Sequence, residues 1–596
     1  MDKSLLLQLL QGTGQEHLLD DYDTLTEEEK SVLSHQIAHS GLDFSLLNVA
    51  LRESLAALDG GDTTKGMGGQ PSTVEPPSRE SLFNVAAVKR ANPEAISRLT
   101  RLGFDAIAKG QVAVLLLAGG SGTRLGISTP KGLFTCELLR EKKSLFQFHC
   151  EKVLRVQRLC VEGALPRAKA PIEETEASEE KRGAATGEPV IPVLIMISEE
   201  NAEATRRFFA ENDWFGLKAT QVIFFVQGML PCYDAASGRI LMASPFQMCV
   251  SPGGNGGVYS SLSRAPLPPH AGDGGRFPET PRTDPAGSDE SVLDRLRRVG
   301  VRYVQIFSVD NLLAKVADPL FYGYAIDTNA QVVVKTTPKT SPEERVGVFA
   351  RVNGEWGVVE YTELGEARAI AREPHTGELR FSCANIACHV CSLAFLAYAS
   401  ERAASSVLYH AARKRIPTRN GPVMGVKLEA FIFDMFRYCK ASRAVEAAKE
   451  TRKAAAEEGN PPGEDGFRVM QVDRGGEFAP IKNSDAATTD TPTTAARLLL
   501  KLHTRWVEEL LSGVDRTALG GEGGGKGRVI TPEELERALG ILREGKRWVE
   551  VSPLVSYQGE GLAPYVEYLV ERLVYGSEDI VLVDESTNGK FGAAKI

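Results

Sequence analysis

The sequence lacks any hydrophobic run long enough to cross a membrane. Its longest apolar stretch, Val112 to Ala118, falls far short of the ~20 residues that a spanning helix requires. The first residues, MDKSLLLQLLQGTGQEH, contain one short apolar stretch interrupted by Gln and no small-residue cleavage site, so we expect no signal peptide. These absences predict a soluble protein of the cytoplasm.

Regularly spaced cysteine and excess positive charge are also missing. Nine cysteines are scattered between Cys136 and Cys439, and this odd, irregular set does not indicate a disulfide framework but favours a reducing compartment. Lys and Arg total 69 against 78 Asp and Glu, which gives a formal net charge of −9. A chain with no overall positive field does not attract nucleic acid or an anionic membrane, so any phosphate site must be built locally.

Glycine-rich and proline-rich stretches divide the sequence into patterned segments. The chain has 596 residues, of which 42% are hydrophobic, as is typical of a globular protein with several domains. Residues 1–100 are predicted to form a helical N-terminal region, in which Thr26 and Glu29 have the spacing of a capping box and residues 58–79 form a mobile linker. Further low-complexity segments, which we expect to be surface insertions, occupy residues 168–188, 266–288, 445–466 and 520–527.

Apolar, β-branched runs alternate with helical patterns through the middle of the chain. Runs such as VAVLLLA at 112, VIPVLIMIS at 190 and VRYVQIFSV at 301 are nearly continuous, and stretches such as AEATRRFFAEN have helical spacing. This alternation predicts an α/β fold with a largely parallel sheet covered on both faces. Such sheets bind ligands at the carboxyl ends of their strands, so we expect the chemistry in the loops that follow the runs.

A glycine-rich loop follows the first of these runs. The residues GGSGTRLG occupy positions 119–126, and PKG follows at 130. Because glycine has no Cβ, the backbone N–H groups of such a loop can approach a triphosphate closely, and Arg124 and Lys131 add positive charge. The spacing is one residue longer than the dinucleotide-binding fingerprint, and no Lys-Ser/Thr pair follows as in a P-loop. The loop therefore indicates a phosphate site of another type, with a plain strand-to-helix turn as the alternative.

The segment around this loop closely resembles the signature of the eukaryotic uridylyltransferases. That segment is LLLAGGSGTRLGISTPKGLF, and further segments narrow the resemblance to the UDP-N-acetylglucosamine pyrophosphorylase family, the UTP:N-acetylglucosamine-1-phosphate uridylyltransferases. They are QGMLPCYD at 227, SPGGNGGVYSSL at 251, SVDNLLAKVADPLFYGY at 308, GVVEYTEL at 357, ANIACH at 384, KLEAFIFDMF at 427, FAPIKNSD at 478 and VSPLVSYQGEGL at 551. They occur in the family's order, so the resemblance covers most of the chain.

The resemblance implies a fold and a reaction. The fold would be a three-layer, Rossmann-like nucleotide-diphosphosugar transferase domain over residues 101–445, followed by a smaller α+β C-terminal domain over residues 467–596. The reaction would join UTP and N-acetylglucosamine 1-phosphate, as a sugar phosphate oxygen attacks the α-phosphorus of UTP in line and pyrophosphate leaves. Mg²⁺ or Mn²⁺ is the implied cofactor. We expect no nucleic-acid or membrane partner, and the sequence leaves the oligomeric state open.

The resemblance also implies roles for individual residues. Arg124, Lys131 and Lys482 are expected to neutralise charge on the reacting phosphates. Asp310 ends a strand-like run, where a carboxylate can hold Mg²⁺ against phosphate oxygens. Nucleotide binding is expected from Gly119, Gly120, Gly122, Thr123, Gln227 and Gly254. Sugar binding is expected from Asn255, Glu360, Tyr361, Asn385, Phe431 and Phe433.

Ordinary alternatives exist for several of these positions. An aromatic residue such as Phe431 is as often part of a core as of a substrate pocket, and a loop lysine such as Lys482 is normally only solvated. Residues 383–391 contain three cysteines and a histidine, but no paired C-x-x-C knuckle accompanies them, so we expect no structural metal there.

Two other functions compete with the main interpretation. A UDP-glucose pyrophosphorylase or a broad UDP-sugar pyrophosphorylase would differ chiefly in the N-acyl pocket around Asn385 and Phe433. A regulatory protein that binds nucleotide sugars without turnover would be expected to have lost some of the charged residues at 124, 131, 310 and 482, and all four are present. A glycosyltransferase would carry an Asp-x-Asp metal motif, which the sequence lacks at Asp310.

Overall fold

A mixed sheet forms the centre of the molecule in the computed structural model. Eleven strands belong to it among the described residues, and eight of them lie side by side in one row. In order, these are β2 (Leu82–Asn84), β18 (Phe467–Gln471), β12 (Val332–Pro338), β15 (Cys383–Ser392), β11 (Tyr303–Ser308), β3 (Val112–Leu117), β4 (Val193–Ile197) and β5 (Val222–Val226). Neighbours in this row run parallel, except that β15 is antiparallel to both β11 and β12. The predicted largely parallel sheet is confirmed, with one reversed strand inside it.

The structure describes most but not all of the chain. The described residues are 2–39, 42–59, 73–78, 81–120, 122–162, 189–267, 290–406, 408–440, 466–514 and 530–584. The predicted insertions at 168–188 and 520–527, nearly all of those at 266–288 and 445–466, and most of the predicted linker at 58–79 lie outside the described residues.

Helices cover both faces of the sheet, which gives the three predicted layers. Alternate residues of β3 point to opposite sides, so Val114 joins one core and Leu115 the other. The first core is closed by α5 (Pro93–Ala108), α6 (Leu145–Glu162), α7 (Glu199–Glu211), α10 (Pro319–Asp327) and the first half of α15 (Pro492–Ser512). The second is closed by α8 (Val258–Leu262), α9 (Val292–Arg298), α12 (Leu393–Ser406) and the 3-10 helix η11 (Ile432–Tyr438).

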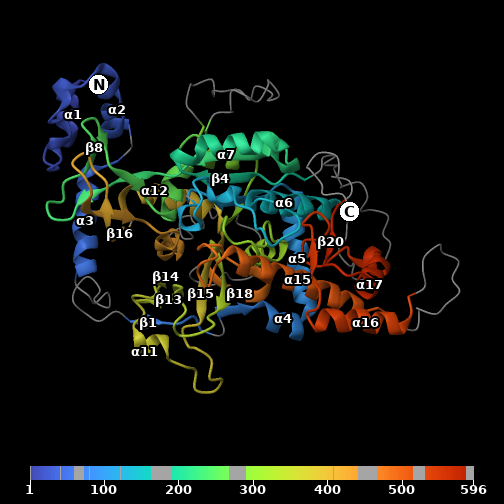
Figure 1. The fold of residues 1–596 in the computed structure, drawn as a ribbon. Coiled ribbons are helices and arrows are strands. Elements are labelled where there is room, and N and C mark those ends of the chain that lie inside the picture. The colour runs from blue at the N-terminus through green and yellow to red at the C-terminus, as the bar shows by residue number, and fades with distance from the viewer. Residues whose placement is uncertain are drawn as a thin grey trace, which may run out of the picture.

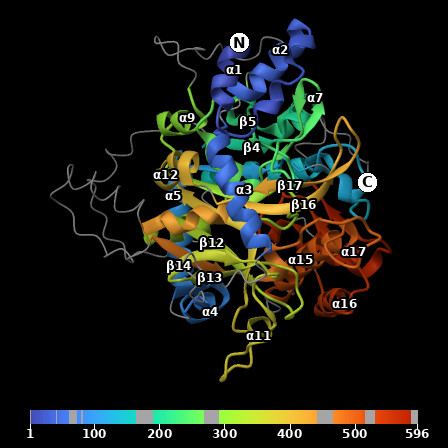
Figure 2. The same cartoon turned by 90° about the vertical axis from the view of Figure 1, so that its left-hand side faces the viewer.

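The N-terminal region is helical, as predicted. It contains α1 (Lys3–Leu10), α2 (Glu27–Ser34) and α3 (Phe44–Asp59). The capping box at the start of α2 is confirmed, because the Thr26 side chain accepts from the Glu29 N–H and the Glu29 carboxylate accepts from the Thr26 N–H. These helices share a core with a small sheet of β16 (His410–Ile416), β17 (Val423–Glu429) and β7 (Tyr233–Asp234), and Figure 2 shows α3 lying across β16 and β17.

The C-terminal unit has a core of its own. It packs the end of α15 with α16 (Pro532–Arg543), α17 (Val566–Tyr575) and the parallel pair β19 (Val549–Val551) and β20 (Ile580–Leu582). Figure 1 shows these red helices and the blue N-terminal helices at opposite ends of the molecule. No helix in the described part of the chain is both long and apolar enough to span a membrane.

The central sheet and the cores do not follow the predicted domain ranges. The strand that begins at Phe467 is β18, which lies inside the central sheet between β12 and β2. The C-terminal core begins only in the second half of α15, with Val507, because Leu499 earlier on the same helix packs in the central core. At the other end, β2 and the first half of α5 lie within residues 1–100 and yet belong to the central layers. The sheet and the helices that cover it are thus built from segments far apart in the chain, so the predicted ranges do not coincide with the cores.

Candidate active site

The predicted site residues follow strands that end at one edge of the sheet. The glycine loop follows β3, Gln227 follows β5, and Asp310 lies two residues after β11. These three strands run parallel within the same sheet, so their carboxyl ends lie at the same edge. The reversed strand β15 begins at this edge, and Asn385 is its third residue. The sheet therefore assembles residues that are far apart in sequence.

The glycine loop closes tightly and meets Gln227. It forms the short 3-10 helix η5 (Thr123–Leu125), which ends at Gly126 in the left-handed conformation, with a φ of 78°. A Cβ on Gly119 would lie 2.3 Å from Oε1 of Gln227, so the Gln227 carboxamide lies directly against the first glycine. The glutamine is only 6% exposed. Two predicted nucleotide-binding positions thus come together, and a side chain at Gly119 would displace the Gln227 carboxamide.

Lys131 and Asp310 form an ion pair at the same edge. Lys131 Nζ lies 2.8 Å from Asp310 Oδ2, and each side chain is 15% exposed. Burial alone would raise the pKa of the Asp310 carboxyl, but Lys131, the Ser308 hydroxyl and Lys482 together hold this pKa below its ordinary value. Asp310 is therefore an ionised carboxylate facing two lysines.

A distant loop brings Lys482 to this pair. The Ile481 N–H donates to the Asp310 carbonyl at 3.0 Å, and the Ser484 N–H donates to the Arg124 carbonyl at 3.1 Å. Lys482 itself is 43% exposed and lies 3.9 Å from the Asp490 carboxylate. Its charge also acts on Glu360. Burial raises the pKa of that carboxyl above its ordinary value, and Lys482 partly offsets the increase. The segment is thus tied both to the glycine loop and to the residue predicted to hold the metal.

The residues predicted to bind sugar lie around a second tight turn. Gly254 has a φ of 81°, and a Cβ there would lie 2.3 Å from the Ala430 carbonyl oxygen. The Asn255 side-chain oxygen accepts from the Ile432 N–H at 2.9 Å, so this amide anchors η11. The Gly253 N–H donates to the Gly228 carbonyl, which places the turn next to Gln227. The positions predicted to bind nucleotide and those predicted to bind sugar are therefore neighbours in the structure.

The two phenylalanines of η11 and its cap have different surroundings. Their rings stack with centroids 5.1 Å apart and planes 24° apart. Phe433 is only 6% exposed and belongs to the core beneath the sheet, whereas Phe431 lies at the margin of that core. The core-packing alternative therefore describes Phe433 better than Phe431.

Glu360 and Asn385 meet at Gly347. The Asn385 N–H donates to the Gly347 carbonyl at 2.9 Å, and a Cβ on Gly347 would lie 2.9 Å from Oε1 of Glu360. The Asn385 side-chain oxygen accepts from the Ala387 N–H at 2.9 Å. Tyr361, the next residue after Glu360, is 45% exposed and lies on the surface.

The sequence raises two possible metal sites, a structural metal at residues 383–391 and a Mg²⁺ ion at Asp310. The His389 ring is fully buried, and burial lowers its pKa to about 3, so it is neutral. No group of three or more His, Cys, Asp or Glu side chains that could hold a metal ion occurs among the described residues. Asp310, as a single ionised carboxylate, suits a Mg²⁺ ion that takes its other ligands from water and substrate phosphates.

Comparisons with known proteins agree with this geometry. The family model of UTP–glucose-1-phosphate uridylyltransferase matches residues 70–268 and 287–509. The chain belongs to this uridylyltransferase family. It is 34% identical over 560 residues to UDP-N-acetylglucosamine diphosphorylase 2 of Arabidopsis thaliana, covering 94% of this chain and 90% of that protein.

Two further relatives of this uridylyltransferase cover nearly its whole length. The UDP-N-acetylglucosamine pyrophosphorylase of Saccharomyces cerevisiae is 29% identical over 580 residues, which is 95% of this chain and 98% of that one. The crystal structure of the uridine diphosphate N-acetylglucosamine pyrophosphorylase from Trypanosoma brucei in complex with inhibitor is 40% identical, with a TM-score of 0.79, and covers 98% of this chain and 99% of that chain.

Sequence reasoning missed a polar cluster beside the residues predicted to bind the sugar. His410 Nε2 lies 3.2 Å from both carboxylate oxygens of Asp434, and its ring is 4.7 Å from that of Phe431. Burial alone would lower the pKa of His410, but Asp434, Glu363 and Glu360 raise it above its ordinary value. Asp434 lies within the segment FIFDMF and was available as a signal, whereas the sequence around His410 contains no local pattern that marks it.

Proposed function

We propose that this enzyme makes UDP-N-acetylglucosamine and pyrophosphate from UTP and N-acetylglucosamine 1-phosphate. The observation that carries the proposal is the convergence of the glycine loop, the Lys131–Asp310 pair and Lys482 at one sheet edge. The names of the Arabidopsis, yeast and trypanosome relatives support the N-acetylglucosamine substrate. The reaction needs no protein nucleophile, because the sugar phosphate oxygen attacks the α-phosphorus of UTP while pyrophosphate leaves on the opposite side.

The nucleotide half of the site would bind UTP through backbone and amide groups. Gly119, Gly120, Gly122 and Thr123 supply a loop on which phosphates can approach the backbone closely. The Gln227 carboxamide offers a donor and an acceptor, which suits the edge of a uracil ring. Gly254 would allow the chain to pass close to the bound nucleotide.

Positive charge would stabilise the transition state. Arg124, Lys131 and Lys482 are placed to neutralise charge that develops on the transferring and leaving phosphates. Asp310 would hold Mg²⁺ or Mn²⁺, which when bound draws charge from the phosphate oxygens. The Lys131 ammonium, which donates to Asp310 at 2.8 Å, orients that carboxylate.

The sugar half of the site would recognise hydroxyls and the N-acetyl group. Glu360, Tyr361 and Asn385 are proposed to bind the hydroxyls and the amide, with Asn255 and the Phe431–Phe433 pair closing the N-acyl side. Because the stacked rings form an apolar wall next to polar groups, the pocket is suited to a methyl-bearing amide.

A panel of sugar 1-phosphates tests this function. With UTP and Mg²⁺, pyrophosphate release should be faster for N-acetylglucosamine 1-phosphate than for glucose 1-phosphate by about tenfold in kcat/KM, because polar groups made for an amide stay unpaired without it. Addition of EDTA in excess should abolish release in either case. Equal rates would instead favour a broad-specificity UDP-sugar pyrophosphorylase, and no release with any sugar would favour the regulatory alternative.

A further inference from the structure

Two chain segments far apart in sequence pair directly behind the proposed reaction centre. The Leu312 N–H donates to the Ala479 carbonyl at 3.1 Å, and the Ile481 N–H donates to the Asp310 carbonyl at 3.0 Å. Asp310 lies on the first of these segments, and Lys482 lies on the second. Their separation is therefore determined by how the segments 310–312 and 479–482 are held together.

The Asn311 side chain bridges these segments. Its Nδ2 donates to the Glu477 carbonyl at 2.8 Å, and its Oδ1 accepts from the Ala479 N–H at 2.9 Å. The side chain is only 3% exposed, so both halves of the carboxamide are satisfied away from water. Asn311 also pairs with Pro480 as an isolated β-bridge. One side chain next to Asp310 thus holds two residues of the segment that leads to Lys482.

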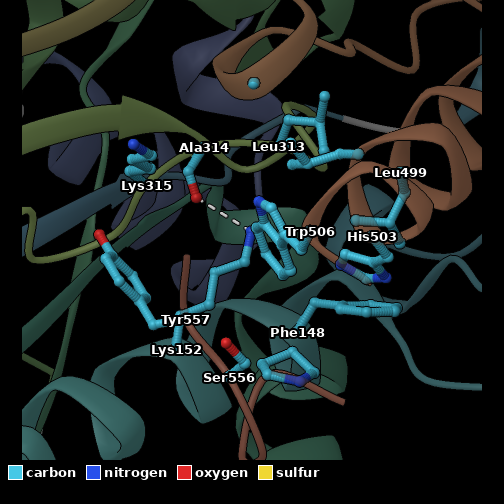
Figure 3. Close-up of a pocket in the computed structure, with 13 residues that line it drawn as sticks. Phe148, Lys152, Leu313, Ala314, Lys315, Leu499, His503, Trp506, Ser556 and Tyr557 are labelled. Carbon is cyan, nitrogen blue, oxygen red and sulfur yellow. Dashed lines mark hydrogen bonds between the residues drawn. The ribbon is translucent and has the colours of Figure 1, made fainter. Parts of the chain in front are cut away.

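Other buried side chains support each segment separately. Lys152 donates to the carbonyls of Leu312 and Ala314 at 2.8 and 2.9 Å, and Figure 3 shows it reaching Ala314 at the wall of a cleft beneath this loop. On the other segment, the Glu477 carboxylate accepts from Lys335, which also donates to Asp318 at 2.6 Å. Each segment is therefore hydrogen-bonded to a buried lysine, and the Asn311 carboxamide connects the two segments.

We infer that Asn311 is a positioning residue for phosphate transfer, which sets the Lys482 ammonium at the right place relative to Asp310. The inference rests on the proposed function, since it assigns Asn311 its effect through Lys482. The Asn311 side chain bonds Glu477 and Ala479 and, among the described residues, makes no hydrogen bond to the glycine loop, so we expect UTP binding in the ground state to depend on it little. The residue therefore acts on kcat through the placement of a charge that matters as the phosphates react.

The substitution Asn311→Asp tests this with almost no change in size. The aspartate still accepts from the Ala479 N–H, but a carboxylate oxygen then faces the Glu477 carbonyl where an N–H donated. We expect kcat to fall by about tenfold or more, because a displacement of ~1 Å at a reacting group can cost 10²-fold, while the KM for UTP stays within about twofold. If Asn311→Asp does not fold, Asn311→Ser carries the same comparison.

A double-mutant cycle distinguishes positioning from general stability. In a Lys482→Met background, Asn311→Asp should lower kcat by less than about twofold further, because the charge it positions is already gone. Gln305→Glu is the matched control. Gln305 is another buried carboxamide, which donates to the Lys315 carbonyl and accepts from the Asp318 N–H, so neither of these bonds reaches the segment 479–482. Its effect on kcat should be the same factor in both backgrounds, and the same result for Asn311 would overturn the inference.

Hydrogen exchange gives a readout that does not depend on turnover. In Asn311→Asp, amides of residues 479–484 should exchange faster than in the unmodified protein, while those of β18 at 467–471 stay unchanged. Unchanged exchange at 479–484 would overturn the positioning role, whatever the activity. If the unmodified protein releases no pyrophosphate but exchange increases as expected, the proposed function fails while Asn311 still positions the segment.

Discussion

At the scale of single residues, the site depends on charges that the chain holds against the cost of burial. Asp310 is 15% exposed and still ionised, because Lys131 contacts it and Lys482 lies nearby. Lys482 is less buried and lies on a loop that pairs with the residues after Asp310. The two lysines therefore differ: Lys131 contacts the carboxylate directly, whereas the more exposed Lys482 lies 3.9 Å from Asp490 and acts on Asp310 only through its charge.

Lys482→Met should separate transition-state stabilisation from substrate binding. If the ammonium neutralises charge only as the phosphates react, kcat should fall by ~10²-fold, about 2.7 kcal/mol, with the melting temperature nearly unchanged. Arg124→Ala should instead raise the KM for UTP, because we propose that its loop contacts the bound triphosphate in the ground state. Steady-state kinetics with both substrates varied, and a thermal melt of each variant, are the measurements.

The control for this prediction is Lys501→Met. Lys501 is an exposed lysine on α15, so its removal should change neither kcat nor KM. A Lys482→Met enzyme with unmodified kcat would return Lys482 to the role of a solvated surface lysine.

At the scale of elements, the residues proposed to bind the sugar lie beside the contact between β16 and η11, which we call the join. His410 on β16 contacts Asp434, and the Asp434 carboxylate also accepts from the Phe431 N–H at 2.8 Å. The same aspartate thus caps the helix that carries the aromatic pair and holds the edge of the small sheet. Any change in the charge of His410 acts on this join.

The join should weaken as pH rises. Burial alone would lower the pKa of His410 in the folded protein. Asp434, Glu363 and Glu360 together outweigh burial and raise this pKa above its ordinary value of 6.5. The stabilisation is therefore fully present below pH 6.5 and lost as pH rises through the folded-state pKa. The difference in melting temperature between the unmodified protein and His410→Gln should be larger at pH 6 than at pH 9.

His17→Gln provides the opposite sign as a control. Burial lowers the pKa of His17, which contacts the Ile240 carbonyl, so this histidine favours the folded state more as pH rises. Equal differences in melting temperature at both pH values for His410→Gln would show that the His410–Asp434 contact carries no net charge effect.

At the scale of the whole molecule, buried polar contacts attach the C-terminal core to α6. Arg155 on α6 is 9% exposed and donates through Nε to Glu560 at 3.0 Å. Lys143, just before the helix, contacts both Glu151 and Ser552. The Glu550 carboxylate accepts from the backbone N–H groups of residues 140 and 141. The C-terminal unit therefore contacts α6, the same helix whose Lys152 donates to the carbonyls of Leu312 and Ala314 in the loop after Asp310.

Glu560→Gln should loosen this attachment. The amide keeps the size of the side chain but removes one of the two carboxylates that pair with Arg155 in the described part of the chain, so the buried guanidinium keeps only Glu162. We expect a loss of about 1–3 kcal/mol in the free energy of unfolding, measured by urea denaturation. Glu508→Gln, which breaks an exposed ion pair with Arg543, should cost less than about 1 kcal/mol. Equal losses for the two variants would indicate that the contact between the units contributes no more than a surface pair.

The sequence by itself determined the class of fold and the pieces of the site. Near-continuous apolar runs alternating with helical patterns specify strands and helices locally, because side-chain periodicity depends on nearest neighbours. The capping box at Thr26 and the tight glycine turn after β3 are local in the same sense. The motifs around Gln227, Asp310 and Lys482 were recognised in another way, through their resemblance to the segments of the uridylyltransferase family.

Only the tertiary structure decided which of these pieces meet. The reversal of β15, the place of β18 inside the central sheet and the true start of the C-terminal core depend on strand pairing across hundreds of residues. The contacts of Asn311 with residues 477 and 479, and of His410 with Asp434, join segments that carry no matching pattern in the sequence. Such contacts arise from how whole layers pack, and a hydrogen bond between distant side chains leaves no periodic trace in the chain that makes it.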